Sequence, residues 1–226
     1  SLFTQEPTPI AVAPAANAIG AVVVVNPEAV IIGIDVFLES SIVLDIETSA
    51  VCIKPLAPDC EGDVVIPDGV EYICCYAFQY EIYDVDEDSN TSITGVVIPD
   101  SVKEIGKEAF WAASNLTSMN IPDSVTSIGK NAFKNCVGLT SVVLPDSLAS
   151  LGEAAFKGCT NLSRCILPGI LQKIDKSTFD GCTSLEKVEI PNSVVSIDNR
   201  AFAGCIKWNS VTLPSQLQFI GEAVFD

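Results

Sequence analysis

The chain has 226 residues and a formal net charge of −17, from 29 acidic and 12 basic residues. This charge repels phosphate groups and argues against nucleic acid and anionic membrane surfaces as partners. Histidine is absent, which removes the commonest general base and the Ser-His-Asp, Cys-His and HExxH arrangements. We therefore expect no enzyme, no catalytic residue and no cofactor.

Mean hydropathy is high, at +0.40, but no segment is suited to crossing a membrane as a helix. The longest apolar stretch, Ala18 to Val25, contains eight residues, whereas a helical span needs about 20. Membrane contact is therefore expected only through a partner complex. The chain starts at Ser1 and its single methionine is Met119, so we expect a processed or trimmed product.

Residues 1–60 are predicted to form an apolar N-terminal arm and a degenerate capping region. Prolines separated by alanines predict an irregular arm, and apolar runs rich in valine and isoleucine then predict short strands. One interpretation is a cap that covers the first repeat. The alternative is a segment that docks onto a larger assembly through apolar residues such as Val23, Val25 and Ile31.

A repeat of 23 residues dominates the remainder of the chain. Three residue types keep this period, which excludes chance and indicates a stacked architecture. They are a hydrophobic-proline pair beginning at residues 98, 121, 144, 167, 190 and 213, a phenylalanine at 110, 133, 156, 179, 202 and 225, and a cysteine at 136, 159, 182 and 205.

Within one unit, the spacing of Leu139, Val142 and Leu144 predicts a short strand that pairs with its neighbours. Proline ends this ladder, since it has no N–H to donate, and the Asp-Ser after it suits a turn. Gly152 is predicted to occupy a corner with positive φ. The alanine, phenylalanine and cysteine that follow have the spacing of one inward face of a helical turn.

The segment Ile121-Pro-Asp-Ser-Val125-Thr-Ser-Ile128-Gly129-Lys-Asn-Ala132-Phe133-Lys-Asn-Cys136 resembles the consensus of BspA-like leucine-rich repeats. The resemblance implies an α/β repeat solenoid, right-handed, with short parallel strands and short helical or 3₁₀ turns. We assign residues 61–226 to about seven such units, the last incomplete. The family is found in bacterial surface proteins and in many protist and algal proteins, and implies a binding or adhesion module with no shared active site.

The first unit carries an acidic insertion at residues 80–91. Asp84, Asp86 and Asp88 have the spacing that begins a calcium-binding loop, and they are weak candidates for a metal site. Ser89 stands where such a loop has glycine, and Gly95 where it has glutamate. A solvated acidic loop is the favoured interpretation.

The chain has nine cysteines. The four that follow the repeat are expected to be buried, reduced and inert, because stacked side chains point in parallel rather than toward one another. Cys60 is a candidate to form a disulfide with Cys74 or Cys75, which would brace the N-terminal cap.

The predicted strands present their outward residues as one surface, and we take this surface as the candidate binding face. It is small and polar, with a basic spot and an apolar spot, and lacks the aromatic anchors of a strong interface. A plainly solvated sheet is the alternative. The candidate residues are Thr140, Ser141, Val143, Arg164, Ile166, Glu186, Lys187 and Glu189.

Two functions fit these features. The first is a non-catalytic protein-interaction module of a secreted or cell-surface protein. The second is a structural subunit of a large, possibly membrane or organellar, complex, held through the N-terminal arm and the open end of the solenoid. The partner in either case is expected to be protein, and an extracellular or cell-surface location is favoured.

Overall fold

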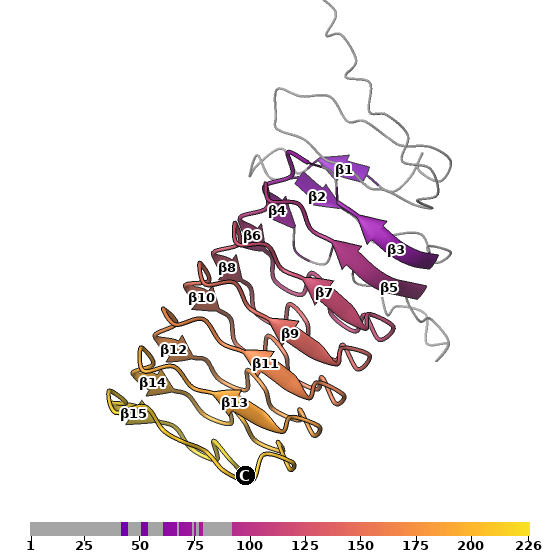
Figure 1. Cartoon of the computed structure of the whole chain (residues 1–226). Coiled ribbons are helices and arrows are strands. Elements are labelled where there is room, and N and C mark those ends of the chain that lie inside the picture. The colour runs from indigo at the N-terminus through magenta and orange to yellow at the C-terminus, as the bar shows by residue number, and fades with distance from the viewer. Residues whose placement is uncertain are drawn as a thin grey trace, which may run out of the picture.

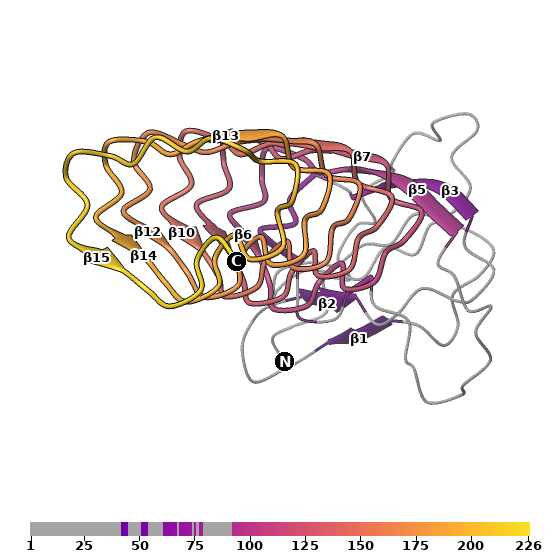
Figure 2. The ribbon, with the colours of Figure 1, turned by 90° about the horizontal axis from the view of Figure 1, so that it is seen from below.

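The computed structural model describes residues 42–44, 51–53, 61–66, 68–73, 75, 77–78 and 92–226. This part of the chain is an elongated stack of coils (Figure 1). The residues buried inside the stack are mostly apolar. Two strand ladders run along the stack, and Figure 2 shows them on different sides of the coils. No helix occurs within the described ranges.

Each described coil contributes one strand to the second ladder, and every coil except the last contributes one strand to the front ladder. Every pairing recorded within either ladder is parallel, which confirms the predicted parallel strands. The front strands are β3 (Glu61–Val65), β5 (Ser92–Val97), β7 (Ser118–Asn120), β9 (Ser141–Val143), β11 (Arg164–Ile166) and β13 (Lys187–Glu189). The second strands are β4 (Tyr72–Ile73), β6 (Glu104–Ile105), β8 (Ser127–Ile128), β10 (Ser150–Leu151), β12 (Lys173–Ile174), β14 (Ser196–Ile197) and β15 (Phe219–Ile220).

Near the N-terminal end of the stack, β1 (Ile42–Leu44) and β2 (Val51–Ile53) form an antiparallel pair. Strand β2 lies beside β4. The rest of residues 1–60 and the acidic insertion at 80–91 lie outside the described residues, so the capping and docking interpretations stay predictions. The handedness of the solenoid likewise stays a prediction.

The predicted helical turns are wrong, because the corner backbone bonds to the next coil as well as to itself. The amides of Glu108, Phe110 and Ala112 donate to carbonyls of the following coil at 2.8–2.9 Å. An α-helix would instead keep these bonds within one segment. Left-handed residues also recur along the corner, which no regular right-handed helix accommodates; they include Glu108, Asn131, Ala154, Ser177 and Arg200, with φ between 55° and 58°.

The glycine at the corner is required because adjacent coils pack closely there, and not because the backbone needs a positive φ. Gly152 lacks the positive φ that its place in the repeat suggested, whereas Gly158 and Gly181 have it. A Cβ built on Gly152 would lie 2.6 Å from backbone atoms of Gly129 and Lys130 in the preceding coil. Glycine therefore lets adjacent coils approach each other at this corner.

Substituting Gly129→Ala is expected to lower the free energy of unfolding by about 1–3 kcal/mol, since overpacking forces backbone shifts. The added Cβ would lie 2.6 Å from the backbone nitrogen of Lys107. Gly169→Ala is the matched control, because nothing lies within 4 Å of its Cβ position. Urea denaturation of both variants tests this, and an equal effect in the two would contradict it.

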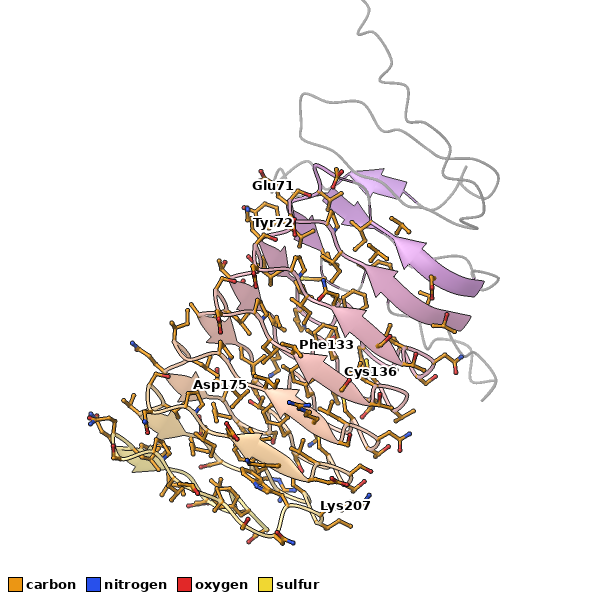
Figure 3. The ribbon with its side chains drawn as sticks, in the orientation of Figure 1. Glu71, Tyr72, Phe133, Cys136, Asp175 and Lys207 are labelled. Atoms are coloured by element: carbon orange, nitrogen blue, oxygen red, sulfur yellow. The ribbon has the colours of Figure 1, made fainter. Side chains whose placement is uncertain are left out.

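The interior of the stack is a column of phenylalanine rings. Their centroids are 4.6–5.8 Å apart and their planes differ by only 4–6°. Figure 3 labels Phe133 and Cys136, which mark this column and the cysteine row beside it. The rings are those of Phe78, Phe110, Phe133, Phe156, Phe179, Phe202 and Phe225, and all but the last are at most 1% exposed.

The last coil departs from the repeat. Residues 209–213 form no strand against β13, although the pattern predicts one. The preceding position holds Trp208, where earlier coils bury a leucine, and the indole packs edge-on against Phe202 and Phe225. We attribute the lost pairing to this larger side chain, which does not fit a slot shaped for leucine.

Candidate interaction surface

The register of the front ladder places the predicted surface residues in straight rows. Ser141 pairs with Arg164, which pairs with Lys187. Two residues further along each strand, Val143 pairs with Ile166, which pairs with Glu189. Because successive strand residues point to opposite sides, both rows lie on the outer face, and we call it the front face.

Burial follows the same alternation. The middle residues Val142, Cys165 and Val188 are 2–5% exposed and belong to the core. On the outer side, Val143 is 60% exposed and Ile166 is 41% exposed. These two aliphatic side chains therefore lie next to each other in contact with solvent, as the predicted apolar spot requires.

A third row of hydroxyl residues borders the front face. The amide and the hydroxyl of Ser163 both donate to the carbonyl of Thr140, at 2.9 and 3.0 Å. Thr140 donates in the same way to Thr117, more weakly, at 3.3 and 3.4 Å. These hydroxyls already bond the preceding coil, so this row braces the ladder as well as bordering the face.

A hollow of about 490 Å³ lies on the front face between β11 and β13. The sequence singled out five of the residues that line it for partner binding, and the structure brings them together. These five are Arg164, Ile166, Glu186, Lys187 and Glu189.

The charges around the hollow are unevenly paired. Lys187 Nζ lies 2.6 Å from Glu189 Oε1, and this hydrogen bond, more than the charges of Lys187 and Arg164, lowers the pKa of the Glu189 carboxyl. The Arg164 guanidinium forms no ion pair with any residue in the described ranges. Arg164 therefore acts on Glu189 only at a distance, and its guanidinium has no direct carboxylate contact among the described residues.

The apolar row extends beyond the residues that the sequence analysis selected. Val65 and Val97 pair with each other and are 40% and 54% exposed. Val97 pairs in turn with Asn120, which interrupts the row before Val143. The signal for these valines was present in the repeat, since they occupy the same strand position as Val143.

Comparison with known proteins agrees with this geometry. A family model described as the BspA type leucine-rich repeat region matches residues 88–185 and 172–226 in six copies. The chain belongs to the BspA-type leucine-rich repeat family. No curated protein matches the chain.

Solved structures of bacterial leucine-rich repeat proteins resemble this BspA-type chain. A leucine-rich cell surface protein of Faecalibacterium prausnitzii is 27% identical, with a TM-score of 0.68 over 84% of this chain and 51% of its own. A leucine-rich repeat protein of Bacteroides ovatus is 25% identical, with a TM-score of 0.57 over 82% and 55%. One from Treponema pallidum is 25% identical, with a TM-score of 0.53 over 78% and 92%. The chain spans about half the length of the first two.

Other sequence candidates lie outside the described residues. They are Val23, Val25 and Ile31 of the N-terminal arm, and Asp84, Asp86 and Asp88 of the acidic insertion. Where the structure does describe the chain, no three acidic or cysteine side chains cluster as metal ligands. In the same ranges no helix is long and apolar enough to cross a membrane.

The cysteines of the BspA-type repeats are buried free thiols, as predicted. Each thiol donates to the carbonyl of a phenylalanine in the preceding coil, such as Cys136 to Phe110 and Cys159 to Phe133, at 3.0 Å. Burial raises the pKa of Cys136 to about 12. Cys75 is an exposed free thiol, so the suggested bond from Cys60 to Cys75 is not formed, and Cys60 and Cys74 lie outside the described residues.

A buried carboxylate links three consecutive coils. Asp180 accepts bonds from Lys157 Nζ at 2.9 Å and from Arg200 Nη2 at 3.1 Å. Burial by itself would raise the pKa of Asp180, but the bonds from Lys157 and Arg200 outweigh burial and lower it. Lys157 and Asp180 occupy the same repeat position, 23 residues apart, whereas Arg200 occupies a different one. This cluster was not predicted from the sequence, because a mixed position of lysine and aspartate does not indicate which cation of another position it meets.

Asp180→Asn is expected to lower the free energy of unfolding at neutral pH by about 1–2 kcal/mol, since bonds to charged groups are strong but the two cations are partly solvent-screened. A carboxyl with a lowered folded pKa stabilises above its unfolded pKa, near 3.8. That contribution disappears as pH falls through the folded pKa, so the cost should shrink in acid. Denaturation at several pH values checks this, with exposed Asp146→Asn as control; a cost independent of pH would contradict it.

Proposed function

We propose that this chain is a non-catalytic protein-interaction module that binds its partner through the front face of β9, β11 and β13. The observation that carries the proposal is the hollow lined by Arg164, Ile166 and Lys187, with exposed Val143 beside Ile166 on the adjacent strand. Apolar contacts beside charged groups are the usual composition of protein interfaces. The surface is broad and without aromatic anchors, which favours a modest affinity.

The proposed setting is the outside of a cell. Support comes from the structural likeness to a leucine-rich cell surface protein of Faecalibacterium prausnitzii. Strong net negative charge suits a soluble, exposed repeat domain that does not adhere to nucleic acid or anionic lipid. A role in adhesion follows from this setting.

The residues around the hollow favour binding over catalysis. The chain has no histidine, and the lysine of the face is already bonded to Glu189. The nearest thiol, Cys165, is buried and its pKa is raised by burial, so it is a poor nucleophile. No group here is arranged to take or give a proton at a reacting atom.

Variants of the full chain test the proposal. Binding to fractions of an extract from the source organism is measured by biolayer interferometry with the double variant Val143→Ser and Ile166→Ser. Loss of two exposed aliphatic contacts should weaken saturable binding at least tenfold, by about 1.4 kcal/mol or more. Tyr72→Ser is the matched control, because Tyr72 is 42% exposed on the second ladder. Equal binding by the double variant, or loss only in the control, would overturn the proposal.

A structural role in a larger complex is the second candidate, and the last coil favours it. Large apolar side chains are exposed there, a state that marks a contact surface either for a partner or for a further coil of the solenoid. They are Ile206, Val211, Leu213, Phe219, Ile220 and Phe225, with exposures of 41–79%. In this role the isolated chain would associate through that end, and sedimentation of an Ile206→Ser and Phe219→Ser variant would show reduced association.

A further inference from the structure

The hollow between β11 and β13 has features that select one kind of partner segment. Two cationic residues, Arg164 and Lys187, and two acidic residues, Glu186 and Glu189, line it together with Ile166. Lys187 and Glu189 satisfy each other, whereas the Arg164 guanidinium forms no ion pair with the described residues. Glu189 is near enough for the charge of Arg164 to contribute to its lowered pKa, but no described carboxylate is in contact with the guanidinium, whose N–H donors therefore remain available to a partner.

An arginine in this position recognises a carboxylate better than it recognises other polar groups. Its planar guanidinium offers parallel N–H donors that match the two oxygens of a carboxylate. Cys165 is buried directly behind it, and the neighbouring strands hold the rows in register. The backbone that carries Arg164 is thus rigid, which reduces the entropy lost on binding.

The spacing along β11 fits an extended chain. Arg164 and Ile166 are separated by one inward residue, so their side chains leave the same face about 6.6–7 Å apart. Residues two apart in any extended partner segment have this same separation. Val143, beside Ile166 on β9, widens the apolar contact.

We propose that this hollow binds an extended polypeptide segment in which an acidic residue and an aliphatic residue are separated by one position. The carboxylate contacts Arg164, and the aliphatic side chain packs on Ile166 and Val143. This proposal rests on the proposed function and specifies the partner sequence that the front face accepts.

Nuclear magnetic resonance of the full chain, labelled with ¹⁵N and ¹³C, tests the proposal even when binding is weak. The probe is the peptide acetyl-Ser-Asp-Ser-Val-Ser-Asp-Ser-Val-Ser-amide, and its control replaces both aspartates by asparagine. The expected result is a saturable shift of the Arg164 Nε–H and Ile166 methyl signals. The asparagine peptide should bind at least tenfold more weakly.

Three variants separate specific recognition from general charge. Arg164→Gln should weaken the aspartate peptide tenfold or more, and Arg164→Lys should restore only part of the affinity. Lys103→Gln removes the same charge next to the second ladder, where Lys103 is exposed, and should leave binding unchanged. Backbone amide spectra confirm that each variant is folded.

The proposal is overturned if the two peptides bind equally, if neither shifts the front-face signals, or if Arg164→Gln and Lys103→Gln weaken binding equally. These outcomes do not decide the proposed function, because partner binding by the Val143 and Ile166 variants is measured separately. If the Val143 and Ile166 variant loses partner binding while the aspartate peptide causes no shift, the front face binds protein but does not recognise a carboxylate. If both fail, the front face is not the interaction surface.

Discussion

Substituting Phe156→Ala is expected to lower the free energy of unfolding by about 3–5 kcal/mol, because a large buried side chain is removed and a cavity remains. Phe156 stacks on Phe133 at 5.2 Å and on Phe179 at 5.6 Å, and it is fully buried. In a solenoid each coil contacts only its neighbours, so losing this ring weakens two interfaces in the middle of the stack. The two halves should then unfold less cooperatively.

Urea denaturation followed by circular dichroism measures both effects. Phe225→Ala is the matched control, since Phe225 is 41% exposed and stacks on Phe202 alone among the phenylalanines of the described column. Its cost should be well below that of Phe156→Ala. Similar costs in the two variants would contradict the view that the stacked rings are the main core of the fold.

Alkaline unfolding is expected above pH 9, because burial makes five thiols harder to ionise in the folded state than in the unfolded state. The pKa of Cys136 and that of Cys205 are raised by burial to about 12, from 9.0, and burial raises those of Cys159, Cys165 and Cys182 too. The unfolded chain releases these protons at lower pH than the folded chain. The contribution of these thiols to the free energy of unfolding is therefore fully present below pH 9. It falls as pH rises toward the folded pKa values, by about 1.4 kcal/mol per pH unit for each thiol.

Thermal denaturation between pH 8 and 11 measures this loss. Cys165→Val is a suitable comparison, since Val142 and Val188 occupy the same inward position on the adjacent strands. That variant should keep its core packing, and its loss of stability above pH 9 should be smaller by the contribution of one thiol. A stability profile that is flat above pH 9, or buried thiols that react with a thiol reagent as fast as Cys75 in the folded protein, would show that the thiols are accessible.

The period of the repeat was enough to predict the stack, because it is imposed by contacts between identical positions. Phe133 and Phe156 can share a core only if their coils are parallel and in register, and the same reasoning places Arg164 beside Lys187. The outward rows of the front face follow from strand alternation once the register is known.

The corners could not be predicted from residue types. Glu108, Asn131, Ala154 and Ser177 occupy equivalent left-handed positions and have little chemistry in common. Their conformation is determined by hydrogen bonds to the next coil, which no single unit contains. The second ladder was not predicted either, because a strand of two residues is too short to show an alternating pattern.

The hollow on the front face could likewise not be predicted from the sequence. Five of its lining residues were selected from the sequence, but the charge pattern around it depends on the ion pair between Lys187 and Glu189, which leaves Arg164 without a direct carboxylate contact. Side-chain pairing of this kind is decided in three dimensions among several near-equivalent partners. The acidic insertion displaces Val65 of β3 from the period. Val97 of β5 keeps the period with Val143, but its position was not selected because Asn120 stands between them in the row.

Site-specific photo-crosslinking tests the central claim most directly. A benzoylphenylalanine is placed at position 143 on the front face or, in a parallel sample, at position 72 on the second ladder, and the full chain is irradiated in native extract. We expect position 143 to capture a defined protein, with excess unlabelled chain suppressing the product and position 72 giving none. Crosslinks to that protein from position 72 alone, or from the last coil alone, would show that the front face is not where this chain binds its partner.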